Sequence, residues 1–471
     1  MSSNKLDACL IIDIGKTNIK CVLLDELGQT LWSRSQPNIS HTDKAYPYFD
    51  LDGIWQWLQS SLHFANTIAL ISAINISTHG ACAVLIDEQG ELVLPVLDYE
   101  HPIPEDISQQ YDAIRPDFTQ TLSPNLPLGL NLGRQLFWLQ QQYPVEFART
   151  HHVLMYPQYW VWRLTGQAVT EVTSLGCHTD LWLPAEQTYS SLLDELVLRS
   201  AMPPIKTGYE VVGGPTDEVC QSTGLSANCR IYSGVHDSNA GFARYLYSIP
   251  DRPVTLVSMG TWVICMTTEQ RLKNLQECRD TLGNVSVAGN LLPCARFMGG
   301  REFEQICQLT NSDMTGDYQP DDIQQLIDDG VFALPPFSQS GGPFAGREGR
   351  IIGKPASGSA LASLYLALMI DYQLDLLGVI GDVIFGSASR KNPLMCQLLA
   401  QLRPRQRILL SGDSAGTVVG AWCLTRWQQA PDPSLTQFDI AKATNINGLL
   451  IYRDRWRDLS EQIDRPVSLA G

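Results

Sequence analysis

One local pattern occurs twice in this chain, and it restricts the fold more than any other feature. An apolar strand runs into a turn that contains glycine and threonine, and a second strand follows. The first copy surrounds residues 13–18 and the second surrounds residues 258–261. Such strands, separated by stretches of helical periodicity, are typical of α/β proteins. The repetition predicts a duplicated α/β architecture, with one domain over residues 1–248 and another over residues 249–471.

Helices are expected between and after these strands. Asp50 can cap a helix whose apolar stripe contains Ile54, Trp55, Leu58 and Leu62. In the second half, the sequence predicts a long helix over residues 357–380 and shorter ones over residues 392–402 and 416–427. Each of these segments has apolar residues at helical spacing or follows a small-residue turn.

Length and charge limit the classes of function. The chain has 471 residues, enough for two or three domains at about 100–200 residues each. It carries 33 Lys and Arg against 49 Asp and Glu, a formal net charge of −16. Such a surface repels the phosphates of nucleic acids and anionic lipids. We therefore expect neither nucleic acid nor a membrane as a main partner, whereas a small anionic ligand needs local donors and a cation.

The cysteines and the N-terminus indicate a cytoplasmic protein. Twelve cysteines are scattered along the chain without C-x-x-C spacing, which favours buried thiols over a disulfide framework or a zinc site. The apolar run over residues 8–12 is too short for a signal peptide and stops at Asp13. The apolar stretch over residues 360–370 is broken by Asp371, which favours a core helix over a membrane span.

The two strand–turn–strand elements carry groups suited to phosphate. In the first, the backbone N–H groups around Gly15 and the side chains of Lys16, Thr17 and Asn18 can donate to phosphate oxygens, and Asp13 can hold a hydrated Mg²⁺. The alternative is a plain hairpin with a surface lysine. The segment is not a Walker A loop, because G-x-x-x-x-G-K is absent. The second element offers Gly260 and Thr261, so that two facing turns would bracket a triphosphate.

Asp237 is the candidate general base. It follows a strand and stands where a helix rich in small residues begins. A carboxylate at a strand end can accept the proton of an attacking sugar hydroxyl during phosphoryl transfer. An aspartate at a helix start is also a common N-cap, and on this segment alone the cap is the simpler interpretation.

Further polar and small residues could bind ligands. His79, Asp98, Glu100 and His101 follow predicted strands and could hold a polyol, although each such residue alone is more often structural. The small residues of segment 415–421, Gly420 among them, would let a flat ring lie against a helix start; close helix packing is an equal alternative. A comparable turn covers residues 386–392.

Taken in this order, these segments resemble the FGGY carbohydrate kinases along nearly the whole chain. Gly234-Val235-His236-Asp237 matches the family's Gly-x-His-Asp segment, whose aspartate is the catalytic base. The resemblance implies a two-domain α/β fold of the actin/hexokinase/Hsp70-like (ribonuclease H-like) type with a central cleft, the sugar mainly on the first domain and ATP mainly on the second. It implies the following residues: Asp237 as base; Asp13 and Asp237 for Mg²⁺; Gly15, Lys16, Thr17, Asn18, Gly260, Thr261, Gly386, Ser387, Asn392 and Gly416 for ATP; His79, Asp98, His101 and Asp237 for the sugar.

Three segments depart from the family pattern. Lys16 replaces the usual Thr or Ser, Gly386-Ser387-Ala388-Ser389 replaces a three-glycine run, and Asp98-Tyr99-Glu100-His101 replaces Trp-x-Asp-x-Arg. The resemblance implies an ATP-dependent kinase for a ketose such as L-rhamnulose or L-fuculose. Xylulose, ribulose and glycerol-like polyols stay open as substrates, and a homodimer stays open as the assembly. A non-catalytic sugar or nucleotide sensor and an actin/Hsp70-type ATPase are the alternatives from other classes.

Overall fold

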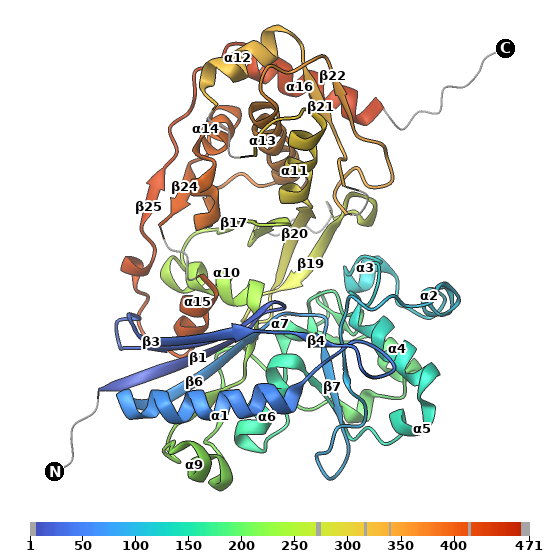
Figure 1. The fold of residues 1–471 in the computed structure, drawn as a ribbon, viewed down its shortest axis with the longest axis vertical. Coiled ribbons are helices and arrows are strands. Elements are labelled where there is room, and N and C mark those ends of the chain that lie inside the picture. Colours follow the sequence, from blue (N-terminus) through green and yellow to red (C-terminus); the bar gives the residue numbers. More distant parts are fainter. Residues whose placement is uncertain (1–5, 270–274, 315–317, 339–340, 413–415, 463–471) are drawn as a thin grey trace. The chain divides into compact units, whose positions relative to one another are not determined.

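The structure is a computed structural model that describes residues 6–269, 275–314, 318–338, 341–412 and 416–462. Contacts between Cα atoms divide the chain into two compact units. The first contains Met1–Pro250, Gly283–Leu291 and Ala415–Leu435, and the second contains Asp251–Leu282, Leu292–Ser414 and Thr436–Gly471. Figure 1 shows the elements of both units.

A seven-stranded sheet is the centre of the first unit, with the order β14-β15-β6-β1-β2-β3 and with β16 paired to β6. Strand β1 runs parallel to β6 and antiparallel to β2, which in turn pairs with β3. The strands are β1 (Asp7–Ile14), β2 (Asn18–Leu24), β3 (Thr30–Pro37), β6 (Leu70–Thr78), β14 (Val211–Gly213), β15 (Arg230–Tyr232) and β16 (Val235–His236).

Both faces of this sheet are covered, and the alternation of side chains along β1 shows how. Leu10, Ile12 and Ile14 pack into the cluster that includes α1 (Leu51–Ile68) and α6 (Tyr156–Thr165). Cys9 and Ile11 pack on the other side with α10 (Asp237–Ser248) and α15 (Gly416–Leu424). Successive residues of a strand point to opposite faces, so a strand buried on both sides reads as a continuous apolar run.

The remaining elements of the first unit form smaller sheets and short helices. Asp50 caps α1 as predicted, because its carboxylate accepts the Gly53 N–H at 3.1 Å. The strands are β4 (Ser40–His41), β5 (Tyr48–Phe49), β7 (Ala83–Ile86), β8 (Val96–Leu97), β9 (His152–Met155), β10 (Thr170–Glu171), β11 (Trp182–Leu183), β12 (Thr188–Tyr189) and β13 (Ile205–Lys206). The helices are α2 (Glu105–Asp112), α3 (Phe118–Thr121), α4 (Leu132–Gln142), α5 (Pro144–Phe147), α7 (Val172–Leu175), α8 (Leu192–Glu195) and α9 (Asp217–Thr223).

The second unit contains most of another seven-stranded sheet, in the order β19-β20-β18-β17-β23-β24-β25; residues 283–285 of β19 and the first residue of β20 fall within the first unit's segment Gly283–Leu291. Its strands are β17 (Thr255–Met259), β18 (Val263–Thr267), β19 (Thr281–Val285), β20 (Leu291–Phe297), β23 (Val383–Phe385), β24 (Ile408–Ser411) and β25 (Phe438–Ile440); β21 (Phe332–Leu334) pairs separately with β22 (Arg350–Ile352). Its helices are α11 (Gly299–Leu309), α12 (Pro320–Asp328), α13 (Gly358–Leu376), α14 (Pro393–Leu402) and α16 (Leu449–Gln462). Each of the two sheets contains a pair of antiparallel strands joined by a Gly/Thr turn, β1–β2 and β17–β18. This repetition is the duplicated α/β architecture that the sequence predicts.

Helix boundaries in the second half differ slightly from the prediction. Ser357 caps α13, but the helix ends at Leu376 because Gly378 adopts a positive φ of 66° and turns the chain away. Helix α15 ends at Leu424, three residues before the predicted end. Helix α14 begins at Pro393 with Asn392 as its N-cap.

The two units are not contiguous halves of the chain. The change of unit falls between Pro250 and Asp251, and α15 returns to the first unit. There Asn75 of β6 donates its side-chain N–H to the Ala421 carbonyl at 2.9 Å, and the Tyr232 hydroxyl donates to the Thr425 carbonyl at 2.8 Å. The domain limits 1–248 and 249–471 stay a prediction. In the structure the segments Gly283–Leu291 and Ala415–Leu435 also belong to the first unit.

The structure bears on two expectations, one about disulfides and one about membrane-spanning helices. No disulfide joins the cysteines within the described ranges, and most of these thiols are buried. No helix in the described part of the chain combines the length and apolar character that crossing a membrane requires.

Candidate active site

Asn38, which follows β3, fixes the turn between β1 and β2 through two hydrogen bonds. The Gly15 N–H donates to the Asn18 carbonyl at 2.9 Å, which closes the turn. Asn38 donates its side-chain N–H to the Gly15 carbonyl at 2.8 Å and its backbone N–H to the Thr17 carbonyl at 2.9 Å. Thr17 and Asn18 are left exposed at the tip. The turn is therefore a fixed loop with accessible donors, as a phosphate-binding role would need.

The Lys16 side chain pairs with acidic residues outside this turn. Its ammonium forms an ion pair with Asp98 and lies 3.4 Å from a Glu100 carboxylate oxygen. It also lies 5.1 Å from the ring centroids of both Phe49 and Tyr99. The structure thus brings Lys16 to residues predicted for the sugar, although the sequence assigned it to ATP.

His79 lies against the same two rings. Its imidazole is 5.3 Å from Phe49 and 5.7 Å from Tyr99 by ring centroids, and Tyr156 packs on it at 5.1 Å. Nδ1 is 2.9 Å from the Gly80 carbonyl, so it carries the proton, and burial lowers the pKa of the ring. The neutral ring then presents Nε2 as an acceptor, and that atom is buried without a partner in the described residues.

Asp98 pairs with Lys16, whereas His101 belongs to a neighbouring aromatic cluster. Asp98 is only 3% exposed. Burial would raise its pKa, but the Lys16 ammonium and the Glu100 N–H hold that pKa below the usual range. His101 packs its ring on Trp138 at 4.9 Å between centroids, which makes it part of an aromatic cluster beside the site.

Asp237 is the first residue of α10 and is one-third exposed. The N-cap position belongs to His236, so the interpretation of Asp237 as the helix N-cap is wrong. The Asp237 carboxylate accepts the N–H of Ser238 at 2.6 Å and lies 3.4 Å from Nδ1 of His236. Gly80 leaves room for the His236 ring, because a Cβ at position 80 would stand 2.5 Å from the imidazole Nε2.

Asp13 and Asp237 form a pair of carboxylates in the first unit. Burial, followed by the negative charge of Asp237, raises the pKa of Asp13 to about 6, while Lys20 opposes this. Mg²⁺ is usually held by one or two carboxylates and keeps several waters, so this donor set fits a hydrated Mg²⁺. No group of three or more His, Cys, Asp or Glu residues in the described ranges could form a closed metal cage.

The raised pKa of Asp13 predicts a pH-dependent stability. The folded protein keeps the Asp13 proton up to about pH 6, whereas the unfolded chain releases it near the ordinary aspartate pKa of 3.8. Folding therefore binds more protons in this window, and the free energy of unfolding falls as the pH rises through it. At pH 7, Asp13→Asn should be more stable than the wild type by on the order of 2 kcal/mol. Thermal unfolding without nucleotide at pH 7 and pH 5 should show this gap narrowing; a gap independent of pH would contradict the assignment.

The second unit contains a cavity of about 730 Å³ beside the β17–β18 turn. Gly260 lies on its wall, and Gly300 lets the backbone of α11 approach, because a Cβ there would stand 2.4 Å from the Gly260 carbonyl. Asn392 also lines it and is fixed by Tyr318, whose hydroxyl donates to the side-chain carbonyl of Asn392 at 2.6 Å. Phe303 and Tyr318 give the cavity flat apolar walls.

The other residues predicted for ATP are placed less directly. Gly386 follows β23, and its N–H donates to the Val257 carbonyl at 3.1 Å; Ser387 begins a 3₁₀ turn, and Thr261 is exposed in the β17–β18 turn. Gly416 starts α15 in the first unit. Asp413, Ser414 and Ala415 of the same segment lie outside the described residues.

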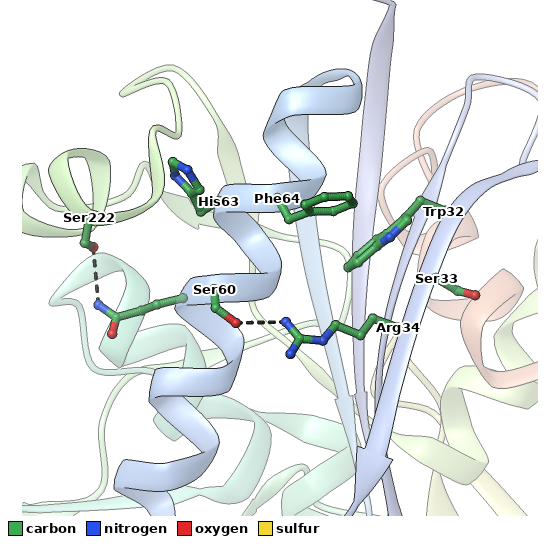
Figure 2. Close-up of a pocket in the computed structure, with 8 residues that line it drawn as sticks. Trp32, Ser33, Arg34, Ser60, His63, Phe64 and Ser222 are labelled. Atoms are coloured by element: carbon green, nitrogen blue, oxygen red, sulfur yellow. Dashed lines mark hydrogen bonds between the residues drawn. The ribbon is translucent and has the colours of Figure 1, made fainter.

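A second cavity, of about 690 Å³, lies between β3 and α1 (Figure 2). Trp32 and Phe64 face each other across it with ring centroids 5.6 Å apart, and Arg34 donates to the Ser60 hydroxyl at 2.8 Å. None of the predicted site residues lines it.

Sequence reasoning missed the aromatic residues of both sites. Phe49 and Tyr99 hold Lys16 and His79, and Phe303 and Tyr318 line the cavity of the second unit. Tyr99 lies inside the segment predicted to bind the sugar, and Phe49 directly precedes Asp50, the cap of α1. Their positions beside these motifs are the sequence signal that could have identified them, and Tyr318 has no such signal.

Two α/β units, each with a Gly/Thr turn, agree with the family resemblance of the sequence. Comparison of the sequence agrees. Residues 8–243 match the N-terminal domain of the FGGY family of carbohydrate kinases, and residues 251–433 match the C-terminal domain of carbohydrate kinase FGGY. The chain belongs to the FGGY family of carbohydrate kinases, and the prediction of a two-domain actin/hexokinase-like fold is confirmed.

Individual relatives are distant. An L-fuculokinase from Salmonella typhi is 27% identical over 270 residues, covering 56% of this chain and 57% of that protein. The alignment thus spans little more than half the length of this relative. A probable L-xylulose kinase from Pasteurella multocida is 24% identical over 306 residues, covering 60% of each chain.

Solved structures extend the similarity to the whole chain. A carbohydrate kinase from Novosphingobium aromaticivorans is 32% identical with a TM-score of 0.88, covering 96% of this chain and 100% of that one. A Plasmodium falciparum glycerol kinase with ADP has a TM-score of 0.81 at 14% identity, covering 99% and 100% of the two chains, and shows the shared fold.

Proposed function

We propose that this protein is an ATP-dependent kinase that phosphorylates a hydroxyl group of a ketose. The observation that carries the proposal is the composition of one site in the first unit. A partly exposed carboxylate, Asp237, interacts electrostatically with His79, whose buried Nε2 has no partner in the described residues, and His79 shares two aromatic rings with Lys16. An acceptor, a donor and a carboxylate beside apolar rings are the groups that bind and activate a polyhydroxy compound.

In this proposal Asp237 is the general base. Its carboxylate accepts the proton of the attacking hydroxyl as that oxygen bonds to the γ-phosphorus and the β–γ bridging oxygen leaves with ADP. Positioning of the hydroxyl supplies much of the rate, up to about 7–11 kcal/mol in well-oriented reactions. Asp13 would hold, through water, the Mg²⁺ that arrives with ATP and neutralises phosphate charge. The exposed turn at Thr17 and Asn18 would donate to the same phosphates.

The nucleotide would occupy the cavity of the second unit. Its volume of about 730 Å³ falls within the range of small-molecule sites, and its walls combine aromatic rings with the amide of Asn392. Gly260 at its edge leaves the backbone open to an approaching phosphate, since a Cβ there would meet nothing nearer than 3.7 Å.

L-Rhamnulose and L-fuculose are the ketoses that we propose first, with xylulose, ribulose and glycerol-like polyols as the alternatives. Two curated relatives are named an L-fuculokinase and a probable L-xylulose kinase, so L-xylulose is tested beside them. A sensor without activity is disfavoured, because a sensor needs neither Asp13 nor Asp237 and both carboxylates are present.

The test is coupled ADP release with MgATP over a panel of L-rhamnulose, L-fuculose, D- and L-xylulose, D- and L-ribulose and glycerol. Stimulation by one sugar would support the kinase and name its substrate. ADP release that no sugar stimulates would favour an actin/Hsp70-type ATPase. Nucleotide binding without any ADP release would favour a sensor.

A further inference from the structure

The aspartate expected to bind the sugar is not free to do so. Asp98 is 3% exposed, and each of its carboxylate oxygens already has a partner. Oδ1 accepts the Glu100 N–H at 3.0 Å, and Oδ2 accepts the Lys16 ammonium. A buried carboxylate with this set of donors is well suited to hold a cation in place.

Lys16, in contrast, presents donors to the site. An ammonium has three N–H donors; Asp98 takes one of them, and a Glu100 carboxylate oxygen lies 3.4 Å away. The Lys16 side chain is 21% exposed, so it reaches solvent where Asp98 does not. The rings of Phe49 and Tyr99, each 5.1 Å away, fix the ammonium by cation–π contact.

Lys16 and His79 lie in the same aromatic cage, because both contact the rings of Phe49 and Tyr99. Lys16 offers a donor, and the unpartnered Nε2 of His79 offers an acceptor. A compound with neighbouring oxygens, one accepting and one donating a hydrogen bond, satisfies both groups.

The charge around Lys16 selects an uncharged ligand. Asp98 neutralises the ammonium, and Glu100, Asp13 and Asp237 add negative charge in the same unit. A sugar acid would bring a further carboxylate into this field, at a cost in binding.

We propose that Lys16 contacts the sugar and helps to determine substrate specificity, that Asp98 is the positioning residue that holds Lys16, and that the sugar is uncharged. This inference rests on the proposed function and assigns Lys16 to the sugar in place of the ATP phosphates.

Lys16→Met is the test, because methionine keeps an unbranched side chain and removes the charge. A hydrogen bond to a charged group is worth about 1.5–3 kcal/mol. We therefore expect the KM for the sugar to rise about 10- to 100-fold, while the Kd for MgATP, measured by calorimetry without sugar, stays within about twofold. A tenfold weaker Kd for MgATP with an unchanged sugar KM would overturn the inference and restore the phosphate role.

Two further variants separate positioning from direct contact. Asp98→Asn should also raise the sugar KM, and adding it to Lys16→Met should have no further effect, because both changes remove the same interaction. Additive losses would mean that Asp98 contacts the sugar itself. Lys206→Met is the matched control, because Lys206 is also a paired lysine of the first unit, 3.0 Å from Glu210, and should change neither constant.

Failure of the proposed function has a different signature. If calorimetry shows that the wild-type protein binds no neutral sugar of the panel, the proposed function and this inference both fall. If a neutral sugar binds and is phosphorylated, only the behaviour of Lys16→Met decides the inference. Turnover of D-gluconate in preference to every neutral sugar would overturn both the predicted charge selectivity and the choice of a ketose, while the assignment of Lys16 to the sugar would still be decided by Lys16→Met.

Discussion

Asp237→Asn is expected to abolish sugar-dependent ADP release while leaving the protein folded and able to bind MgATP. General base catalysis contributes typically about 10²–10⁴-fold, and an amide cannot accept the hydroxyl proton. We therefore expect kcat to fall by at least about 10²-fold with a smaller change in the KM for the sugar. Steady-state ADP release with the sugar identified by the panel measures this directly.

Asparagine at position 237 is expected to leave the fold intact. The Asp237 side chain is one-third exposed and does not occupy the cap position of α10, so asparagine fits the same space. Asp217→Asn is the matched control, because Asp217 is likewise the first residue of a helix, α9, and is exposed. That variant should keep wild-type turnover. Near-normal turnover by Asp237→Asn would remove the base assignment.

The parts of the site that sequence predicts well are those built from neighbours along the chain. The β1–β2 turn, the start of α10 and the cap of α1 each use residues a few positions apart, so their conformations follow from local strand, turn and cap preferences. Asp13 and Asp237 then share an electrostatic environment because β1 and β16 both pair with β6 in parallel. A parallel sheet brings the carboxyl ends of its strands to one edge.

Lys16 shows where such reasoning stops. A lysine inside a turn that resembles a phosphate-binding turn is naturally assigned to phosphate, because the neighbouring residues in the sequence give no other information about the direction of its side chain. Its partner Asp98 is 82 residues away, and the rings that fix it come from β5 and the segment after β8. The direction of a long, flexible side chain depends on such distant contacts, and no local pattern encodes them.

The sequence allows two interpretations of the small residues of α15, a ring-binding surface and close helix packing. For Gly420 the structure decides for packing. A Cβ built on Gly420 would stand 1.7 Å from the Ala240 carbonyl oxygen, so α15 touches the backbone of α10 at this point. This contact joins segments about 180 residues apart and explains why α15 belongs to the first unit.

Gly420→Ala is therefore expected to destabilise the first unit strongly. The added methyl group meets a backbone atom that cannot rotate away, so the two helices must separate and lose packing along their length. Overpacking typically costs about 1–3 kcal/mol and sometimes more, and this contact belongs at the upper end. At roughly 2–4 °C per kcal/mol for a unit of this size, the melting temperature should fall by about 10 °C in differential scanning calorimetry.

The same helix provides the control. Gly416 is the first residue of α15, and a Cβ there would meet nothing within 4 Å, so Gly416→Ala should leave the melting temperature nearly unchanged. Gly416 is also predicted to contact ATP, and a raised Kd for MgATP in this stable variant would support that role. Equal melting temperatures for the two variants would contradict the packing of α15 on α10. Because Asp237 is the first residue of α10, a shift of that helix by Gly420→Ala should also lower sugar-dependent turnover below the melting transition, which links the packing of α15 to the position of the base.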